Sequence, residues 1–84
     1  MKRKDLIDTS KRMVVEYYNR YVQNVETDMS DTDISVDNVI LIEENNISDN
    51  TTHLILKVDC DAWLLYNIIY YEKENRIESY ISLS

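Results

Sequence analysis

The only histidine and the only cysteine of this chain, His53 and Cys60, are its first candidates for chemistry, because such a pair can activate a thiolate nucleophile. The two residues stand seven positions apart. On one extended strand, at about 3.3 Å per residue, they would lie about 23 Å apart and on opposite faces. No third residue that would orient the pair is evident. We therefore interpret Cys60 as a buried residue and His53 as a residue beside a turn, and predict that the protein is not an enzyme.

Carboxylates are the other groups that could do chemistry. Asp31, Asp33, Ser35 and Asp37 stand at every second position, as at the start of a calcium-binding loop. The motif then fails, because Val36 stands where the loop needs glycine and an isoleucine stands where it needs a bidentate glutamate. One cysteine and one histidine do not make a structural zinc site. Nothing places two carboxylates in the contrasting environments that acid–base catalysis requires. We expect no metal and no cofactor.

The distribution of charge is the most informative feature of the sequence. Residues 21–56 contain eight carboxylates and no lysine or arginine, whereas residues 1–20 contain six bases and three acids. The formal net charge is −7. Such a charge repels nucleic acid and anionic membranes and steers a protein toward basic surfaces. The expected partner is therefore a basic, nucleic-acid-binding protein, with no direct contact to nucleic acid or membrane.

The spacing of apolar residues predicts the elements that must position these groups. Residues 3–26 repeat apolar positions at the paired intervals of an amphipathic helix, and residues 27–35 form an acidic connection. A strand follows in which Ile34, Val36, Ile40 and Ile42 share one face around a polar Asn38. The opposite face of this strand is partly apolar.

The second half of the chain predicts three further strands. Residues 45–52 form a turn, and a second strand then places Leu54, Leu56, Val58 and Cys60 on one face. Residues 59–61 form a tight turn or a bulge. Residues 62–72 are apolar on both sides, so they are a strand or a helix capped by Asp61, and their β-branched and aromatic residues favour the strand. A polar turn at 72–76 leads to a last strand over 77–83.

Together these elements predict one small α+β domain over residues 1–84. An N-terminal amphipathic helix packs on a four-stranded antiparallel β-meander in the order α-β-β-β-β. This layout resembles cystatin-like and NTF2-like folds in outline. The third strand has a second apolar face, formed by Leu64, Tyr66, Ile68 and Tyr70, which is exposed unless something covers it. A patch of this kind is typical of a dimer or partner interface.

In general character the chain resembles the small, acidic, phage-encoded inhibitors of bacterial defence nucleases, the anti-CRISPR and anti-restriction proteins. The resemblance lies in the short length, the absence of a disulfide, the Lys/Ile/Asn/Tyr-rich composition and the excess of acids from Glu26 to Asp49. It implies a non-enzymatic inhibitor that occupies the basic surface of a CRISPR or restriction nuclease, with nucleic-acid mimicry as one way to do so. The single cysteine and the lack of an apolar leader predict a cytoplasmic location, that of the host cell if the protein is phage-encoded.

The expected recognition surface combines acids of the charged block with two tyrosines of the third strand. Two alternatives stay open: a self-associating structural protein that dimerises through its sheet, and a small NTF2-like enzyme with carboxylates in a pocket. Whether inhibition works by mimicry or by allosteric blocking also stays open. The predicted partner-binding residues are Glu26, Asp28, Asp31, Asp33, Asp37, Glu43, Glu44, Tyr66 and Tyr70.

Overall fold

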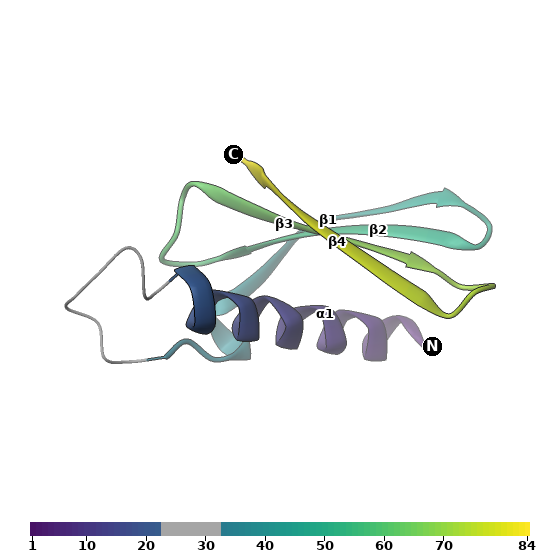
Figure 1. The fold of residues 1–84 in the computed structure, drawn as a ribbon. Coiled ribbons are helices and arrows are strands. Elements are labelled where there is room, and N and C mark those ends of the chain that lie inside the picture. Colours follow the sequence, from purple (N-terminus) through teal and green to yellow (C-terminus); the bar gives the residue numbers. More distant parts are fainter. Residues whose placement is uncertain (23–32) are drawn as a thin grey trace.

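A computed structural model describes residues 1–22 and 33–84 (Figure 1). Four antiparallel strands form one sheet in the order β1-β2-β3-β4, and one helix lies across it. The predicted α+β fold with the order α-β-β-β-β is confirmed, including the strand at residues 62–72. The elements are α1 (Arg3–Tyr17), the π-helical turn η1 (Tyr18–Val22), the 3-10 turn η2 (Val36–Asn38), β1 (Val39–Ser48), β2 (Thr51–Val58), β3 (Leu64–Tyr71) and β4 (Arg76–Leu83).

The helix forms where the apolar periodicity predicts it, and η1 continues it to Val22. Its buried stripe includes Leu6, Ser10 and Val14, which are four residues apart and therefore lie on one face. The predicted helix end at residue 26 lies outside the described residues. Among the described residues, no helix is long and apolar enough to cross a bilayer.

The core lies between α1 and the central strands. On β2 the predicted alternation is confirmed for Leu54, Leu56 and Val58, which are fully buried. Burial of one such side chain stabilises the fold by about 1.5–3 kcal/mol. Cys60 does not extend this face as predicted, because β2 ends at Val58 and Cys60 lies exposed in the turn that follows.

The prediction of an exposed apolar patch on β3 is wrong for most of its residues. Tyr66, Ile68 and Tyr70 are at most 5% exposed, and Leu64 is partly buried. Tyr66 lies opposite Leu56 in the β2–β3 register, so this face of β3 continues the buried face of β2 beneath the helix. The face of β3 that the helix does not cover is the opposite face. Because β3 is apolar on both sides, its sequence does not reveal which side the helix covers.

The predicted facing of the first strand is also wrong. Val39 and Leu41 face the core, whereas Ile40 and Ile42 are about half exposed. The strand begins only at Val39, because residues 36–38 form a 3-10 turn. A bulge between Leu41 and Glu43 then changes which residues face the helix.

Turns without glycine or proline connect the strands. The predicted turn at residues 45–52 is shorter in the structure, because β1 and β2 pair as far as Ser48 and Thr51 and leave two loop residues. The predicted turn at 72–76 is confirmed. Asn75 adopts φ 47° there, the left-handed geometry that asparagine tolerates better than most residues. At the β2–β3 turn the Asp61 carboxylate accepts the backbone N–H of Trp63 at 2.8 Å.

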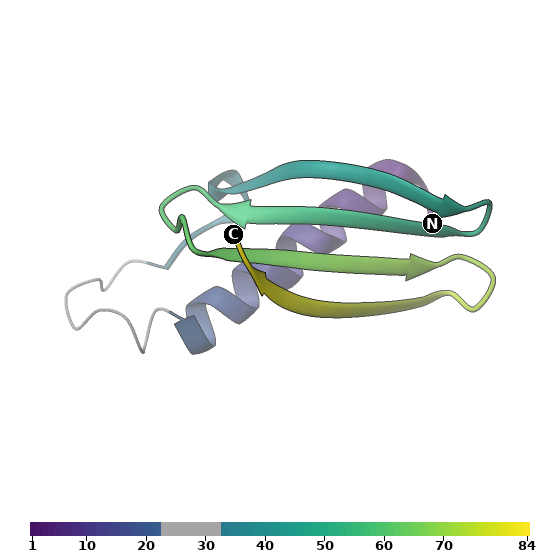
Figure 2. The same ribbon diagram turned by 90° about the horizontal axis from the view of Figure 1, so that it is seen from above.

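The helix crosses the sheet obliquely, which determines what it covers. Figure 2 shows α1 beginning on the β1 side and ending beyond β4. Its contacts are mainly with β1, β2 and η2. A helix about 10 Å across covers about two strands that are spaced about 4.8 Å apart. Within residues 1–22 and 33–84, one helix therefore leaves part of the core face beside β4 uncovered.

Ser10 gives a test of how closely α1 approaches the sheet. Its side chain is fully buried, and its Oγ has no hydrogen-bond partner among the described residues. We expect Ser10→Ala to raise the free energy of unfolding by about 1 kcal/mol, because it removes an unpaired buried hydroxyl and favours the helix. Ser10→Leu should lower it by about 1–3 kcal/mol through overpacking. Urea unfolding followed by circular dichroism measures both changes. Equal stability of all three proteins would contradict the close contact.

Candidate interaction surface

The fold brings part of the acidic block against the basic helix. The bulge in β1 places Glu44 on the helix side, where its carboxylate accepts hydrogen bonds from the Arg3 guanidinium at 2.6–2.9 Å. These hydrogen bonds, together with the negative charge of Glu44, raise the pKa of Arg3. Glu44 is thus occupied within the chain and not displayed alone to a partner.

The other predicted acids do not form one uniform face among the described residues. Asp33, Asp37 and Glu43 are exposed. Asp37, however, lines a hollow together with one acid and two bases of the helix, Asp8, Lys11 and Arg12. Within residues 1–22 and 33–84, no group of three or more potential metal ligands comes together. The remaining predicted acids, Glu26, Asp28 and Asp31, lie outside the described residues.

The two predicted tyrosine anchors are core residues. Tyr70 is 5% exposed, and its hydroxyl donates to Asn75 Oδ1 and accepts from the amino group of Met1, each at 3.3 Å. Tyr66 is 4% exposed and packs edge-on against Tyr17, with ring centroids 6.0 Å apart. Their burial contradicts the prediction that they project from the surface as anchors, although Tyr66 lines a cleft.

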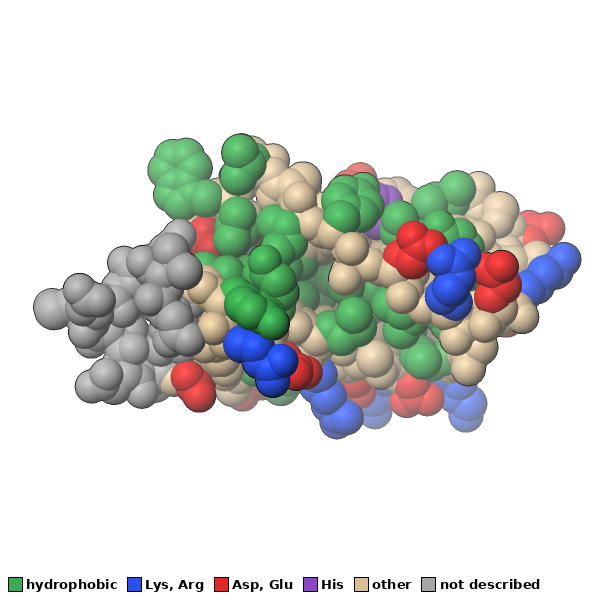
Figure 3. Space-filling view, in the orientation of Figure 1, with side chains coloured by type: hydrophobic (Ala, Val, Ile, Leu, Met, Phe, Trp, Pro, Cys, Tyr) green, Lys and Arg blue, Asp and Glu red, His purple; other side chains and the backbone are tan. Residues whose placement is uncertain are grey.

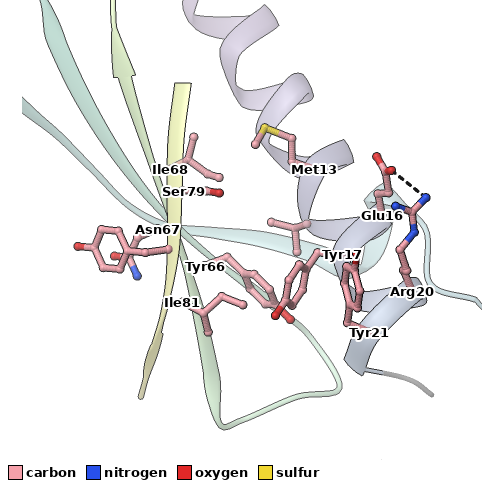
Figure 4. A pocket seen from close by; sticks show the side chains of 12 residues that line it. Met13, Glu16, Tyr17, Arg20, Tyr21, Tyr66, Asn67, Ile68, Ser79 and Ile81 are labelled. Carbon is pink, nitrogen blue, oxygen red and sulfur yellow. Dashed lines mark ion pairs between the residues drawn. The ribbon is translucent and has the colours of Figure 1, made fainter. Parts of the chain in front are cut away.

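A cleft of about 540 Å³ lies between the C-terminal half of the helical segment and the strands β3 and β4. Figure 3 shows hydrophobic side chains gathered on this side of the molecule. Figure 4 shows Tyr17 and Tyr21 on the helical side, with Tyr66 and Ile81 across from them on the strands. The lining residues are Met13, Val14, Glu16, Tyr17, Arg20, Tyr21, Tyr66, Asn67, Ile68, Ser79, Tyr80 and Ile81.

Aromatic rings form one wall of the cleft. The rings of Tyr17 and Tyr21 have centroids 5.0 Å apart and are tilted by 48°. Tyr17 also contacts Tyr66, so the wall is joined to the cleft floor. The charged residues of the lining, Glu16 and Arg20, form an exposed ion pair at 3.3 Å (Figure 4). The cleft is therefore apolar, rich in tyrosine and without net charge.

The outer edge of β4 borders the cleft. Its eight residues pair with β3 without a bulge, and no strand of the described residues lies beyond it. The Ser84 N–H donates to the Trp63 carbonyl at 2.8 Å. Because N–H and C=O directions alternate along an antiparallel strand, the backbone groups of Ile77, Ser79 and Ile81 point away from β3. The other edge, β1, carries two register shifts, which disfavour further pairing.

His53 and Cys60 have separate partners. His53 lies on the sheet face away from the helix, where its Nε2 contacts Asn67 Oδ1 at 2.9 Å. Asn67 in turn donates to Ser82 Oγ at 3.0 Å, so these side chains form a polar link across β2, β3 and β4. The Cys60 thiol contacts the Tyr18 hydroxyl at 3.5 Å. The structure does not bring the histidine and the cysteine together.

Comparison with known protein families, with curated proteins and with solved structures gives no significant match. The cleft therefore has to be interpreted from its own geometry. The sequence alone does not reveal the cleft, because the apolar periodicity of residues 3–26 does not distinguish Tyr17 and Tyr21 at its rim from the buried helix stripe. The available signal was their residue type, since a tyrosine ring with a polar hydroxyl suits the edge of a core.

Two tyrosines of the cleft test this assignment of core and rim. We expect Tyr66→Ala to lower the free energy of unfolding by about 3–5 kcal/mol, because it removes a buried ring. Tyr21 is 53% exposed, so Tyr21→Ala should lower it by about 1 kcal/mol or less. Thermal and urea unfolding of the two variants measure the difference. If both variants lost the same stability, the placement of Tyr66 beneath the helix would be wrong.

Proposed function

We propose that this chain is a non-enzymatic binding protein that takes an extended segment of a protein along β4, with side chains of that segment in the adjacent cleft. The observation that carries this proposal is the oblique end of the helix, which overhangs an unbulged sheet edge and leaves an apolar cleft beneath it. An added strand would satisfy the outward backbone groups of β4. Strand addition to a sheet edge is a recurrent mode of peptide recognition.

The residue types of the cleft favour binding over catalysis. Exposed tyrosines supply large contact areas at low entropic cost, and tyrosine is common among residues that dominate interface energetics. The two charged residues of the lining neutralise each other at the solvent-exposed rim. The side chains of Arg20 and Glu16 are 61% and 68% exposed. These features support a surface that buries apolar side chains of a partner.

Selection from a random peptide display library tests the proposal, because such a selection does not require an identified partner. We expect enriched peptides to carry apolar residues at alternate positions, because one face of an added strand would lie over the cleft. Tyr21→Ala should weaken the binding of these peptides at least about fivefold, as expected for an interface anchor that contributes more than about 1 kcal/mol.

Ile42→Ala is the matched control for this experiment. Ile42 is exposed to a similar extent as Tyr21 but lies at the β1 edge, away from the cleft. The control variant should bind the selected peptides as the unmodified protein does. Peptides that bind the Tyr21 and Ile42 variants equally well would refute a binding role of the cleft.

A second candidate function follows from the net charge of −7 and from the exposed carboxylates of Asp33, Asp37 and Glu43. The chain would inhibit a nucleic-acid-handling enzyme, such as a CRISPR or restriction nuclease, by occupying its basic surface. Proteins bind nucleic acid through rows of lysine and arginine, and an acidic protein competes for such rows. In this case the acids, and not the cleft, would make the essential contacts.

Salt dependence tests this second candidate. A partner captured at low salt should be released as ionic strength rises, because exposed charges are screened over about 8–10 Å at physiological salt. The triple variant Asp33→Asn, Asp37→Asn, Glu43→Gln should capture less of that partner. Glu74→Gln and Asp49→Asn, which alter acids outside this group, serve as controls. Capture that is unchanged by salt and by the triple variant would exclude the electrostatic mechanism.

A further inference from the structure

We propose that the segment that binds along β4 is the β4 strand of a second copy of this chain. The two strands would pair antiparallel about a two-fold axis at Tyr80, so that two four-stranded sheets join into one. This inference rests on the proposed use of the cleft and the β4 edge, and it names the occupant. A two-fold arrangement makes each copy both the donor and the acceptor of the added strand.

The backbone of β4 suits pairing with itself. The outward N–H and C=O groups belong to Ile77, Ser79, Ile81 and Leu83, all of which also place their side chains on the helix side of the sheet. A two-fold axis perpendicular to the sheet keeps both helices on that same side. Outward-facing residues of one strand then meet outward-facing residues of the other. The hydrogen-bond ladder can therefore continue across the axis without a bulge.

In one register of this pairing, the side chains that lie opposite each other are also compatible. It places Tyr80 on the axis, opposite the partner's Tyr80, and Leu83 opposite the partner's Ile77. Leu83 is 77% exposed in the single chain, so this pairing removes an apolar side chain from water. Glu78 faces the partner's Ser82 and not another carboxylate. Like charges directly opposite each other would oppose pairing, and this register contains none.

Charge distribution argues for a second copy over a basic partner at this edge. The cleft lining and β4 together contain two acids, Glu16 and Glu78, and two bases, Arg20 and Arg76, so their formal charges sum to zero. Each acid is ion-paired with one of these bases, and Arg76 also pairs with Glu74 in the turn before β4. The whole chain has a charge of −7, so self-repulsion is lowest where this neutral surface meets its copy. A basic partner would gain no net electrostatic attraction there.

The C-terminal part of the helical segment extends beyond β4, over the place that an added strand would take (Figure 2). Tyr17 and Tyr21 line the cleft opposite Ile81 (Figure 4), near the end of the strand where the partner's Ile77 would lie. The overhanging tyrosines of each copy would thus cover apolar residues of the added strand. The β1 edge offers no equivalent, since its register shifts interrupt the ladder.

Sedimentation equilibrium of the full chain at micromolar to hundred-micromolar concentration tests the proposal. The expected result is a monomer–dimer equilibrium that does not weaken as salt rises, because screening reduces the repulsion between two acidic chains. Ile81→Lys should weaken the dimer by about 100-fold, since each dimer would bury two lysines in an apolar contact. Ile47→Lys, the same change at the exposed end of β1, should leave the dimer intact. A protein that is monomeric throughout this range overturns the proposal.

A cross-link tests the register and does not depend on the folding of Ile81→Lys. In the Cys60→Ser background, Tyr80→Cys should form an intermolecular disulfide under mild oxidation, because residues on the axis form a non-hydrogen-bonded pair with Cα atoms about 4.5 Å apart. Glu78→Cys lies on the same face of β4 but faces the partner's Ser82, so it should cross-link at least about tenfold more slowly. Equal rates for the two cysteines, or no cross-link at position 80, would overturn the pairing.

The outcomes separate this inference from the proposed function. A monomeric chain whose selected peptides still depend on Tyr21 would refute the second copy and keep the cleft as a binding site. A dimer that resists Ile81→Lys and does not cross-link at position 80 would use another surface, which refutes this inference alone. Selected peptides that are indifferent to Tyr21 would refute the proposed function.

Discussion

The structure depends on one geometric constraint: a single helix packs obliquely on a sheet that is wider than the helix. The described helical segment buries Leu6, Ser10 and Val14 against β1–β3 and passes beyond β4 at its C-terminal end. Where it lies over the sheet it builds the core. Where it diverges from the sheet it leaves the apolar cleft. The same constraint therefore produces both the stability of the domain and its candidate binding surface.

The β4 edge belongs to a regular hairpin whose turn contains neither glycine nor proline. The chain contains no glycine or proline, and its β3–β4 turn uses Asn75 in left-handed geometry. The β3–β4 ladder is regular along all eight pairs. Natural sheets usually protect such an edge with a bulge, a proline or an inward-facing charge. On β1 the bulges serve this purpose, whereas β4 has none of the three, which is consistent with an edge that is covered in an assembly.

Tertiary structure also redistributes the charges. Along the sequence, the bases precede a block of acids, which predicts an acidic face. In space, the bulge of β1 directs Glu44 to Arg3, and Asp37 lines one hollow together with Asp8, Lys11 and Arg12 of the helix. On the β4 side, Glu16 pairs with Arg20, and Arg76 pairs with Glu74 and Glu78. A binding mode based on charge and one based on apolar contact therefore belong to different parts of the molecule.

By itself, the sequence determined the order and type of the helix and the four strands, because helical and strand periodicities are local properties of the chain. It also predicted the buried face of β2 and the turn at Asn75. Only the tertiary structure decided which face of β3 the helix covers, because that strand is apolar on both sides. Which side chains of β1 face the helix depended on a one-residue bulge. Such a bulge exchanges the two faces of the strand for all residues that follow it, and it leaves no distinct local pattern in the sequence. The cleft arose from the crossing direction of the helix, which is set by packing against residues far away in the sequence.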